Sequence, residues 1–212
     1  MTNKDIEKKI NKALKLGCKK RKYQLKNGII FKKKSDYLVI LSGSVSNKKY
    51  NYWIGIKRYL SDDYFWDILN MQSNKTEPES LRVIGAFSAP KIILKFDSLN
   101  IDEDFEKFIN ELYDEFDMII ESFIEKNKYI DYVCNHGIAS SNEIILLYYL
   151  EQGDYEKALN IAINQIKLGN RGGFENEGKT FYQWAIEYIK KLIKDGKRVS
   201  SNDSKIIWFI FR

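Results

Sequence analysis

The feature that most constrains the fold is a run of apolar residues between positions 105 and 123 that recur at helical spacing. Neighbours in this run are three or four residues apart for about six turns, so they form one apolar stripe along a helix. Its members are Phe105, Phe108, Ile109, Leu112, Phe116, Ile119, Ile120 and Phe123. Asn100 and Glu103, just before it, have the spacing of a capping box. A helix with such a stripe has to bury it against a second layer of structure.

Strand-like segments upstream predict what that second layer is. Several apolar runs there have the length and alternation typical of strands, and turn residues separate them at Lys26-Asn27-Gly28 and Asn47-Lys48-Lys49. Two more apolar runs flank Ala89-Pro90. The predicted strands are Ile29 to Lys34, Asp36 to Ser46, Tyr50 to Arg58, Leu81 to Phe87 and Lys91 to Phe96. Successive strands joined by tight turns predict an antiparallel meander.

Further helices are predicted on both sides of this region. Residues 4 to 15 have apolar side chains at helical spacing, and Gly17 is interpreted as the stop signal. From Ser140 onward three helices are predicted: one capped by Ser141 or Asn142 that runs to Gln152, one from Gly153 to Leu168, and one from Thr180 to Lys194. Asp62 to Asn70 is ambiguous between helix and strand, and Ser73 to Ser80 is a polar loop.

These elements predict an α+β protein. We expect an antiparallel sheet of about five strands flanked by helices in a sheet domain of residues 1–135, and a helical subdomain of residues 138–212 packed on it. The last eight residues, Lys205 to Arg212, are strongly apolar, so we expect them to pack as a final strand or helix. The alternative is an exposed docking segment.

Charge is distributed unevenly along the chain. The formal net charge is +6, but residues 1 to 34 contain 13 basic and 2 acidic side chains, a local charge of +11. The remaining residues therefore sum to −5, and positions 97 to 126 contain 11 acidic residues against Lys107 and Lys126. One interpretation is that the opposite charges meet within the fold or form solvated faces. The other is a basic face for an acidic partner or a nucleic acid.

The second interpretation gives a specific set of candidate partner-binding residues. Basic side chains cluster after the first helix and in the first long predicted strand, where adjacent chain segments would present them as one strip. The set is Lys19, Lys20, Arg21, Lys22, Lys32, Lys33 and Lys34. Only Tyr23 and Phe31 are interleaved with them, so stacking of nucleic-acid bases is not indicated.

One stretch matches a catalytic motif. Gly173, Gly178, Lys179 and Thr180 fit the G-x-x-x-x-G-K-[ST] pattern of a phosphate-binding loop. That loop normally follows a buried strand, whereas here a predicted helix precedes it, and Glu175 and Glu177 would repel phosphates. We therefore interpret this stretch as a glycine-rich connection between helices, and nucleotide binding remains the minor alternative.

Other chemically active side chains are sparse. His136 is the one histidine, and no nucleophile with an orienting carboxylate stands beside it. The carboxylate pairs Asp62-Asp63 and Asp114-Glu115 are interpreted as solvated faces. Cys18 and Cys134 are far apart, with no metal-binding spacing around them. We therefore expect no catalytic residues, no cofactor and no metal.

Two resemblances add to this interpretation. The segment Leu16-Gly17-Cys18-Lys19-Lys20-Arg21-Lys22-Tyr23, a basic hairpin and the strand Tyr52 to Ile56 together resemble the bacterial family catalogued as domain of unknown function four-three-zero-four. The resemblance spans residues 5 to 130, and Cys18 departs from the Leu-Gly-Phe opening of that family. It implies an α+β domain with no established catalytic residues.

The second resemblance is local. Leu150 to Leu159, with Gly153, Asp154, Tyr155 and Ala158, resembles the helix–turn–helix junction of a tetratricopeptide repeat. No second copy follows at an offset of 34 residues, so the resemblance implies a helical hairpin and no solenoid.

The functional expectation follows from these features together. We expect a non-enzymatic, cytoplasmic protein-binding module, such as an immunity protein that neutralises a bacterial toxin. The alternative is a nucleic-acid-binding protein that uses the basic N-terminal segment. Because the chain opens with charged residues, we expect no secretory signal. Because no apolar run approaches 18 residues, we expect no membrane span.

Overall fold

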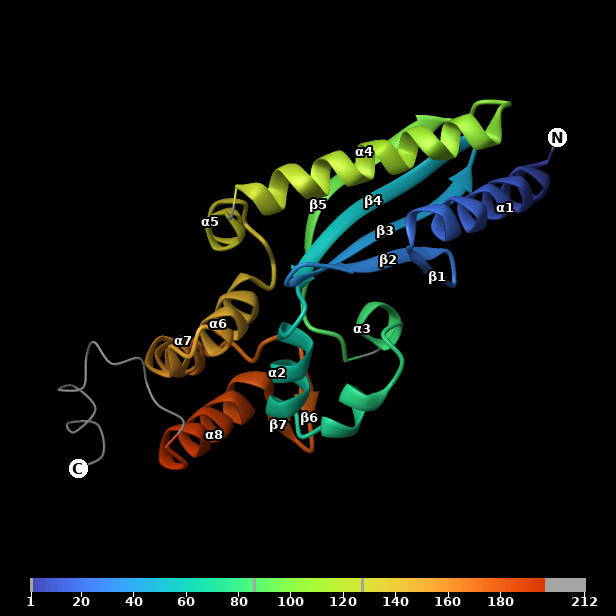
Figure 1. Cartoon of the computed structure of the whole chain (residues 1–212). Coiled ribbons are helices and arrows are strands. Elements are labelled where there is room, and N and C mark those ends of the chain that lie inside the picture. Colours follow the sequence, from blue (N-terminus) through green and yellow to red (C-terminus); the bar gives the residue numbers. More distant parts are fainter. Residues whose placement is uncertain (1, 86, 127, 197–212) are drawn as a thin grey trace. The chain divides into compact units, whose positions relative to one another are not determined.

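The computed structural model describes residues 2–85, 87–126 and 128–196 of the 212-residue chain, and it divides them into two compact units (Figure 1). The first unit comprises Met1–Tyr59, Glu79–Gly85 and Lys91–Tyr132. The second comprises Leu60–Pro78, Ala86–Pro90 and Val133–Arg212, as far as these ranges are described. The predicted tail at Lys205 to Arg212 lies outside the described residues.

This division differs from the one predicted near position 135 because the chain leaves the sheet and returns to it. After its fourth strand the chain forms helix α2 (Ser61–Ile68), whose Phe65 stacks on Phe181 at 5.7 Å between ring centroids, so α2 belongs to the second unit. The chain then comes back to form the fifth strand. Sequence periodicity gave no sign that a helix between two strands packs with residues more than 100 positions away.

The first unit contains the predicted five-stranded antiparallel sheet. Its strands are β1 (Gln24–Lys26), β2 (Ile29–Lys34), β3 (Tyr37–Ser46), β4 (Lys49–Arg58) and β5 (Ile92–Asn100), in the order β1-β2-β3-β4-β5. The Asn27-Gly28 and Asn47-Lys48 turns have positive φ at both residues, which is the conformation that two-residue hairpins need. The α+β fold with an antiparallel meander is therefore confirmed.

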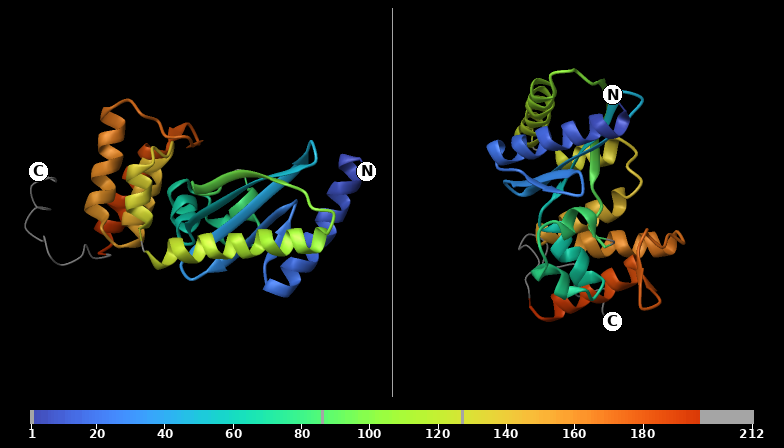
Figure 2. Two further views of the ribbon diagram at one scale, coloured as in Figure 1. Left: turned by 90° about the horizontal axis from the view of Figure 1, so that it is seen from above. Right: turned by 90° about the vertical axis from the view of Figure 1, so that its right-hand side faces the viewer.

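One face of the sheet is covered by helices α1 (Asn3–Arg21) and α4 (Phe105–Glu125), which lie side by side on it (Figure 2). Tyr50 of β4 reaches this layer, since its ring meets Phe108 of α4 edge-on at 6.2 Å. The apolar stripe predicted for α4 faces the sheet, with Phe108, Ile109, Leu112, Phe116 and Ile120 buried. Asp104 caps α4 by accepting from the Lys107 amide, whereas Asn100 ends β5, so the predicted capping box is wrong.

Helix α1 extends past Gly17, so the predicted stop is wrong. Gly17 is buried inside the helix, and a Cβ atom there would lie 2.4 Å from Cε2 of Tyr113 on α4. The glycine therefore serves close packing of two helices instead of ending one. The actual end is Lys22, which caps α1 in the left-handed conformation with φ 59°.

The opposite face of the sheet is covered in part by the short helix α3 (Leu81–Ile84). Val83 packs there against Phe31, Leu38 and Ile40. The predicted strand from Leu81 to Phe87 is therefore wrong, because a short buried apolar run has no periodicity that separates strand from helix. Further along this face the side chains become exposed, and Phe96 of β5 is 77% exposed.

The second unit is helical. With α2 it contains the 3-10 helix η1 (Gln72–Thr76), α6 (Ser141–Glu151), α7 (Tyr155–Lys167) and α8 (Phe181–Lys194), together with the two-residue strands β6 (Glu175–Asn176) and β7 (Lys179–Thr180). Helix α5 (Tyr129–Asn135) spans the boundary between the units along the chain. Helices α6 and α7 form the predicted hairpin: Gly153 has φ +74°, Asp154 caps α7, and Ala158 is fully buried.

Candidate functional site

A regular row of lysines lies on the outer surface of α1. Residues three or four positions apart share one face of a helix, and five lysines follow that spacing on the side opposite the buried apolar residues. They are Lys4, Lys8, Lys12, Lys15 and Lys19, and we call them the lysine stripe. All five are exposed, and no ion pair or hydrogen bond of their ammonium groups occurs among the described residues. At 1.5 Å per residue the stripe is about 22 Å long.

The predicted partner-binding residues do not form one strip. Lys19 belongs to the lysine stripe, and Lys20 and Lys22 are exposed near it. Lys32 is half-buried over the Tyr23 ring at 5.0 Å, whereas Lys33 points to the other face of the sheet, 4.0 Å from the Tyr59 ring centroid. The side chains of consecutive strand residues alternate between faces, which separates Lys33 from its neighbours.

Arg21 and Lys34, the other two predicted residues, are paired with α4. Arg21 lies 2.8 Å from Asp114 and 3.2 Å from Asp117, and Lys34 lies 2.7 Å from Glu121. Burial opposes the charge on Arg21, but the two carboxylates outweigh it and raise the pKa of its guanidinium group. The ammonium group of Lys34 lowers the pKa of Glu121. At these points the opposite charges of the chain do meet within the fold.

The contact between the two helices continues into the core beneath Arg21. Tyr23 donates a hydrogen bond to Asp117, and its ring stacks on Tyr113 at 5.7 Å. The Tyr113 hydroxyl lies 2.9 Å from the Cys18 sulfur and donates to the Leu14 carbonyl at 3.1 Å. Burial raises the pKa of both tyrosines, so they stay protonated hydrogen-bond donors. We call Arg21, Tyr23, Tyr113, Asp114 and Asp117 the α1–α4 junction.

The outer surface of α4 has the opposite charge to α1. Asp114, Asp117, Glu121 and Glu125 line one shallow groove along this helix, and we call them the acidic ridge. Because Arg21 at the end of α1 contacts Asp114 and Asp117, the ridge begins beside the end of the lysine stripe. Unit 1 thus presents a basic region and an acidic region next to each other on its helical layer.

The Gly173 to Thr180 stretch does not have the arrangement of a phosphate-binding loop. Helix α7 precedes it, and β6 and β7 fold it into a small hairpin. Lys179 lies 2.8 Å from each Glu187 carboxylate oxygen, and the Gly173 amide donates to Glu143 at 3.3 Å. Groups that would hold phosphate are therefore bonded to carboxylates, which agrees with the interpretation as a connection between helices.

The remaining candidate residues are separate from one another. His136 is exposed in the turn after α5. Asp62 is buried and accepts from the Ala89 amide at 2.6 Å, so its interpretation as part of a solvated face is wrong. Of the two free cysteines, Cys18 is buried and Cys134 is exposed. Among the residues the structure describes, no group of three or more histidine, cysteine, aspartate or glutamate side chains could hold a metal ion. No described helix has the length and apolar character needed to cross a membrane.

Comparisons with protein-family models, with curated proteins and with solved structures found no match to this chain. The resemblance to domain of unknown function four-three-zero-four therefore stays a prediction. One part of the basic surface of α1 was not predicted from the sequence, namely Lys4, Lys8, Lys12 and Lys15. Their spacing of three and four residues, opposite the apolar face of the same helix, is the signal that identifies them.

Proposed function

We propose that this protein is a non-enzymatic module that binds another protein through the helical layer of its first unit. The observation that carries the proposal is the lysine stripe: five exposed lysines in a row, none with an ion pair among the described residues. Such a concentrated field speeds the approach of a partner of opposite charge and orients it. We also propose the cytoplasm as its location, which fractionation of the native cells would test.

The neighbouring acidic ridge favours a protein over a nucleic acid as the partner. The ridge begins beside the last turn of α1, and charges closer than about 8 Å interact strongly at physiological ionic strength. A continuous polyanion that follows the lysine stripe past the end of α1 would meet Asp114 and Glu121. A protein surface can match both regions, with acidic groups opposite α1 and basic groups opposite α4.

Toxin neutralisation is the specific form of this function that we propose. An immunity protein has to bind its toxin rapidly, and rapid association depends on the kind of charge segregation described above. Coexpression with toxin candidates from neighbouring genes would test this form: survival that depends on the lysine stripe supports it, and equal killing with and without the protein contradicts it.

The general proposal is tested by capture from native cells with matched charge-reversal variants. One variant replaces Lys8, Lys12, Lys15 and Lys19 with Glu. The control replaces four other exposed lysines of the same unit, Lys26, Lys48, Lys49 and Lys107, and so has the same net charge. We expect a stoichiometric protein partner that the wild type and the control retain and the stripe variant loses. Retention by all three proteins, or no retained protein at all, contradicts the proposal.

Nucleic-acid binding is the second candidate, and the regularity of the lysine stripe is the observation that favours it. It predicts binding of duplex DNA or RNA whose affinity falls steeply with salt. If four of the stripe lysines, Lys8, Lys12, Lys15 and Lys19, contact phosphates, replacing them with Gln lowers the magnitude of the slope of log K against log salt by about 3 to 4. Fluorescence anisotropy with a labelled duplex measures this slope, and an unchanged slope excludes the stripe as the binding surface.

A further inference from the structure

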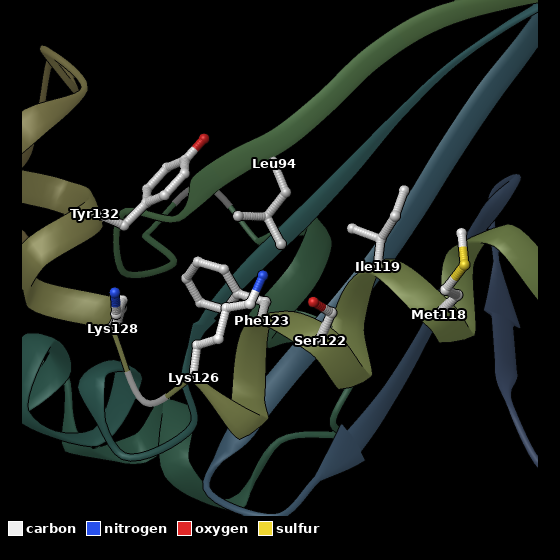
Figure 3. Close-up of a pocket in the computed structure, with 8 residues that line it drawn as sticks. All are labelled: Leu94, Met118, Ile119, Ser122, Phe123, Lys126, Lys128 and Tyr132. Atoms are coloured by element: carbon white, nitrogen blue, oxygen red, sulfur yellow. The ribbon is translucent and has the colours of Figure 1, made fainter.

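The first unit contains an apolar pocket of about 460 Å³ between β5, the second half of α4 and the start of α5 (Figure 3). Leu94 of β5 forms one wall, Ile119 and Phe123 of α4 form another, and Tyr132 of α5 closes the end. Met118 of α4, at the opposite end, is 63% exposed. A volume in this range suits one small ligand.

A β-bulge places Leu94 in the wall. Lys95 pairs with Ile54 and Ile93 pairs with Gly55, so Leu94 has no partner across the ladder. An extra residue of this kind turns a side chain away from the regular alternation of the strand. Leu94 therefore faces α4 and contributes to the pocket instead of to the opposite face of the sheet.

The aromatic walls are held in place by contacts of their own. The Phe123 ring meets the Tyr132 ring nearly edge-on, with 5.5 Å between the centroids, and meets Tyr129 in the same way at 6.4 Å. The Tyr132 hydroxyl donates to the carbonyl of Ile93 at 3.5 Å. Preformed walls lower the ordering cost of binding, since a ligand does not have to immobilise them.

The polar groups around the pocket have one sign of charge. Lys126 and Lys128 are the charged residues that line it, and no carboxylate lines it. Both lysines are exposed, and neither has an ion pair among the described residues. Glu121 and Glu125 line the groove of the acidic ridge, which adjoins the pocket at Met118 and Ser122. The pocket thus combines apolar walls with a cationic rim, which is complementary to an apolar chain that ends in an anion.

We propose that this pocket binds an alkyl carboxylate, with its chain between β5 and α4 and its carboxylate at Lys126 and Lys128. The chain is stabilised by the apolar surface it buries against Leu94, Ile119 and Phe123. The carboxylate accepts hydrogen bonds from the two ammonium groups. Ligand binding at this site does not require a protein partner, so an experiment that contradicts one of the two proposals leaves the other unaffected.

Methionine methyl NMR tests the proposal on the full chain, with sodium decanoate below its micelle concentration as the probe. Met118 lies in the pocket and Met71 lies in the second unit, so the same spectrum contains a site signal and a reference. Met118→Leu assigns the site signal. We expect decanoate to shift the Met118 signal in a saturable way and to leave that of Met71 unchanged. Equal shifts of both signals, or no shift of Met118, overturn the proposal.

Matched variants and probes separate the two parts of the site. Lys126→Ala with Lys128→Ala is expected to weaken decanoate binding about tenfold, whereas Lys107→Ala, at the other end of α4, leaves it unchanged. Decyltrimethylammonium, with the same chain and the opposite charge, is expected not to saturate the site. Ser122→Trp fills the pocket, and Trp and Ser have similar helix propensities, so it should abolish binding without unfolding α4. If the double lysine variant or Ser122→Trp binds decanoate with unchanged affinity, the proposed site is wrong.

Discussion

The basic N-terminal segment divides into two regions with opposite roles. In the α1–α4 junction, Arg21 is half-buried and bonded to two carboxylates, above a layer of buried tyrosines. In the lysine stripe, which ends at Lys19, only two residues before Arg21, five lysines of α1 are exposed. The junction joins two helices, whereas the ammonium groups of the stripe have no ion pair or hydrogen bond within the described structure. Net charge alone therefore does not say what a basic segment does.

The difference is one of position on the helix. The α1 face that meets α4 needs small or apolar residues, which Gly17, Leu14 and Cys18 provide, and a cation fits there only where a carboxylate compensates its burial. On the outer face each lysine stays hydrated, and the side chains contribute little to stability. Changes in the junction should therefore affect folding, and changes in the stripe should affect association.

The largest effect is expected from Tyr113→Ala. Tyr113 is fully buried, packs against Gly17 and Tyr23, and donates to the Leu14 carbonyl. Loss of the ring leaves a cavity between α1 and α4, which should lower the free energy of unfolding by about 3 to 5 kcal/mol. Urea denaturation measures this change. Phe96→Ala, at an exposed aromatic residue, is the control and should stay within about 0.5 kcal/mol; a similar loss in both variants would contradict the comparison.

A smaller effect is expected from Arg21→Met. The substitution keeps most of the aliphatic stem but leaves Asp117 and the Asn110 carbonyl without the guanidinium group. For a half-buried pair of this kind we expect a loss of about 1 to 2 kcal/mol, between the values for exposed and buried ion pairs. Lys20→Met, at the exposed neighbour, should be neutral. Since salt screens ion pairs, the difference between the two variants should shrink at high ionic strength.

Gly17→Ala should lower stability by about 1 kcal/mol, although alanine is the better helix former. The new Cβ would lie 2.4 Å from the Tyr113 ring, and the resulting overpacking outweighs the gain in helix propensity. The sign should reverse when Tyr113 is already Ala, because the ring that clashes is then absent. A double-mutant cycle by urea denaturation measures this coupling, and a destabilising Gly17→Ala in both backgrounds would show that the ring is not the cause.

Gly17 also shows where prediction from sequence stops. The apolar spacing of α4, the strand runs and the two hairpin turns are local signals, and they were sufficient for strands β2 to β5 and the main helices, but not for β1, which was not predicted as a strand. Whether a glycine ends a helix or lets another helix approach depends on Tyr113, 96 positions away in the chain. For the same reason α2 and α3 were not predicted as helices: their apolar runs are short, and the helical structure is stabilised by residues that are distant in the chain.

The charges of the candidate site could be predicted from the sequence, but the arrangement of its residues could not. The excess of basic residues and the acidic stretch of α4 are visible in the sequence, and so is the possibility that they meet. The division of Lys32, Lys33 and Lys34 between two faces follows from strand alternation once β2 is known. The pocket was not predictable, since the bulge at Leu94 and the rings of Phe123 and Tyr132 come together only in the folded unit.

The smallest effect is expected from neutralising the lysine stripe, which should increase stability, whereas the changes in the α1–α4 junction decrease it. Replacing Lys8, Lys12, Lys15 and Lys19 with Gln keeps helix propensity nearly constant and removes repulsion between lysines three and four positions apart. The protein should therefore become more stable by about 0.5 kcal/mol at low salt, and the gain should disappear near 1 M salt. Urea denaturation at the two ionic strengths measures it. A loss of stability would mean that the stripe contributes to the fold. A gain together with lost association would show that these lysines persist despite a cost in stability, as residues retained for binding do.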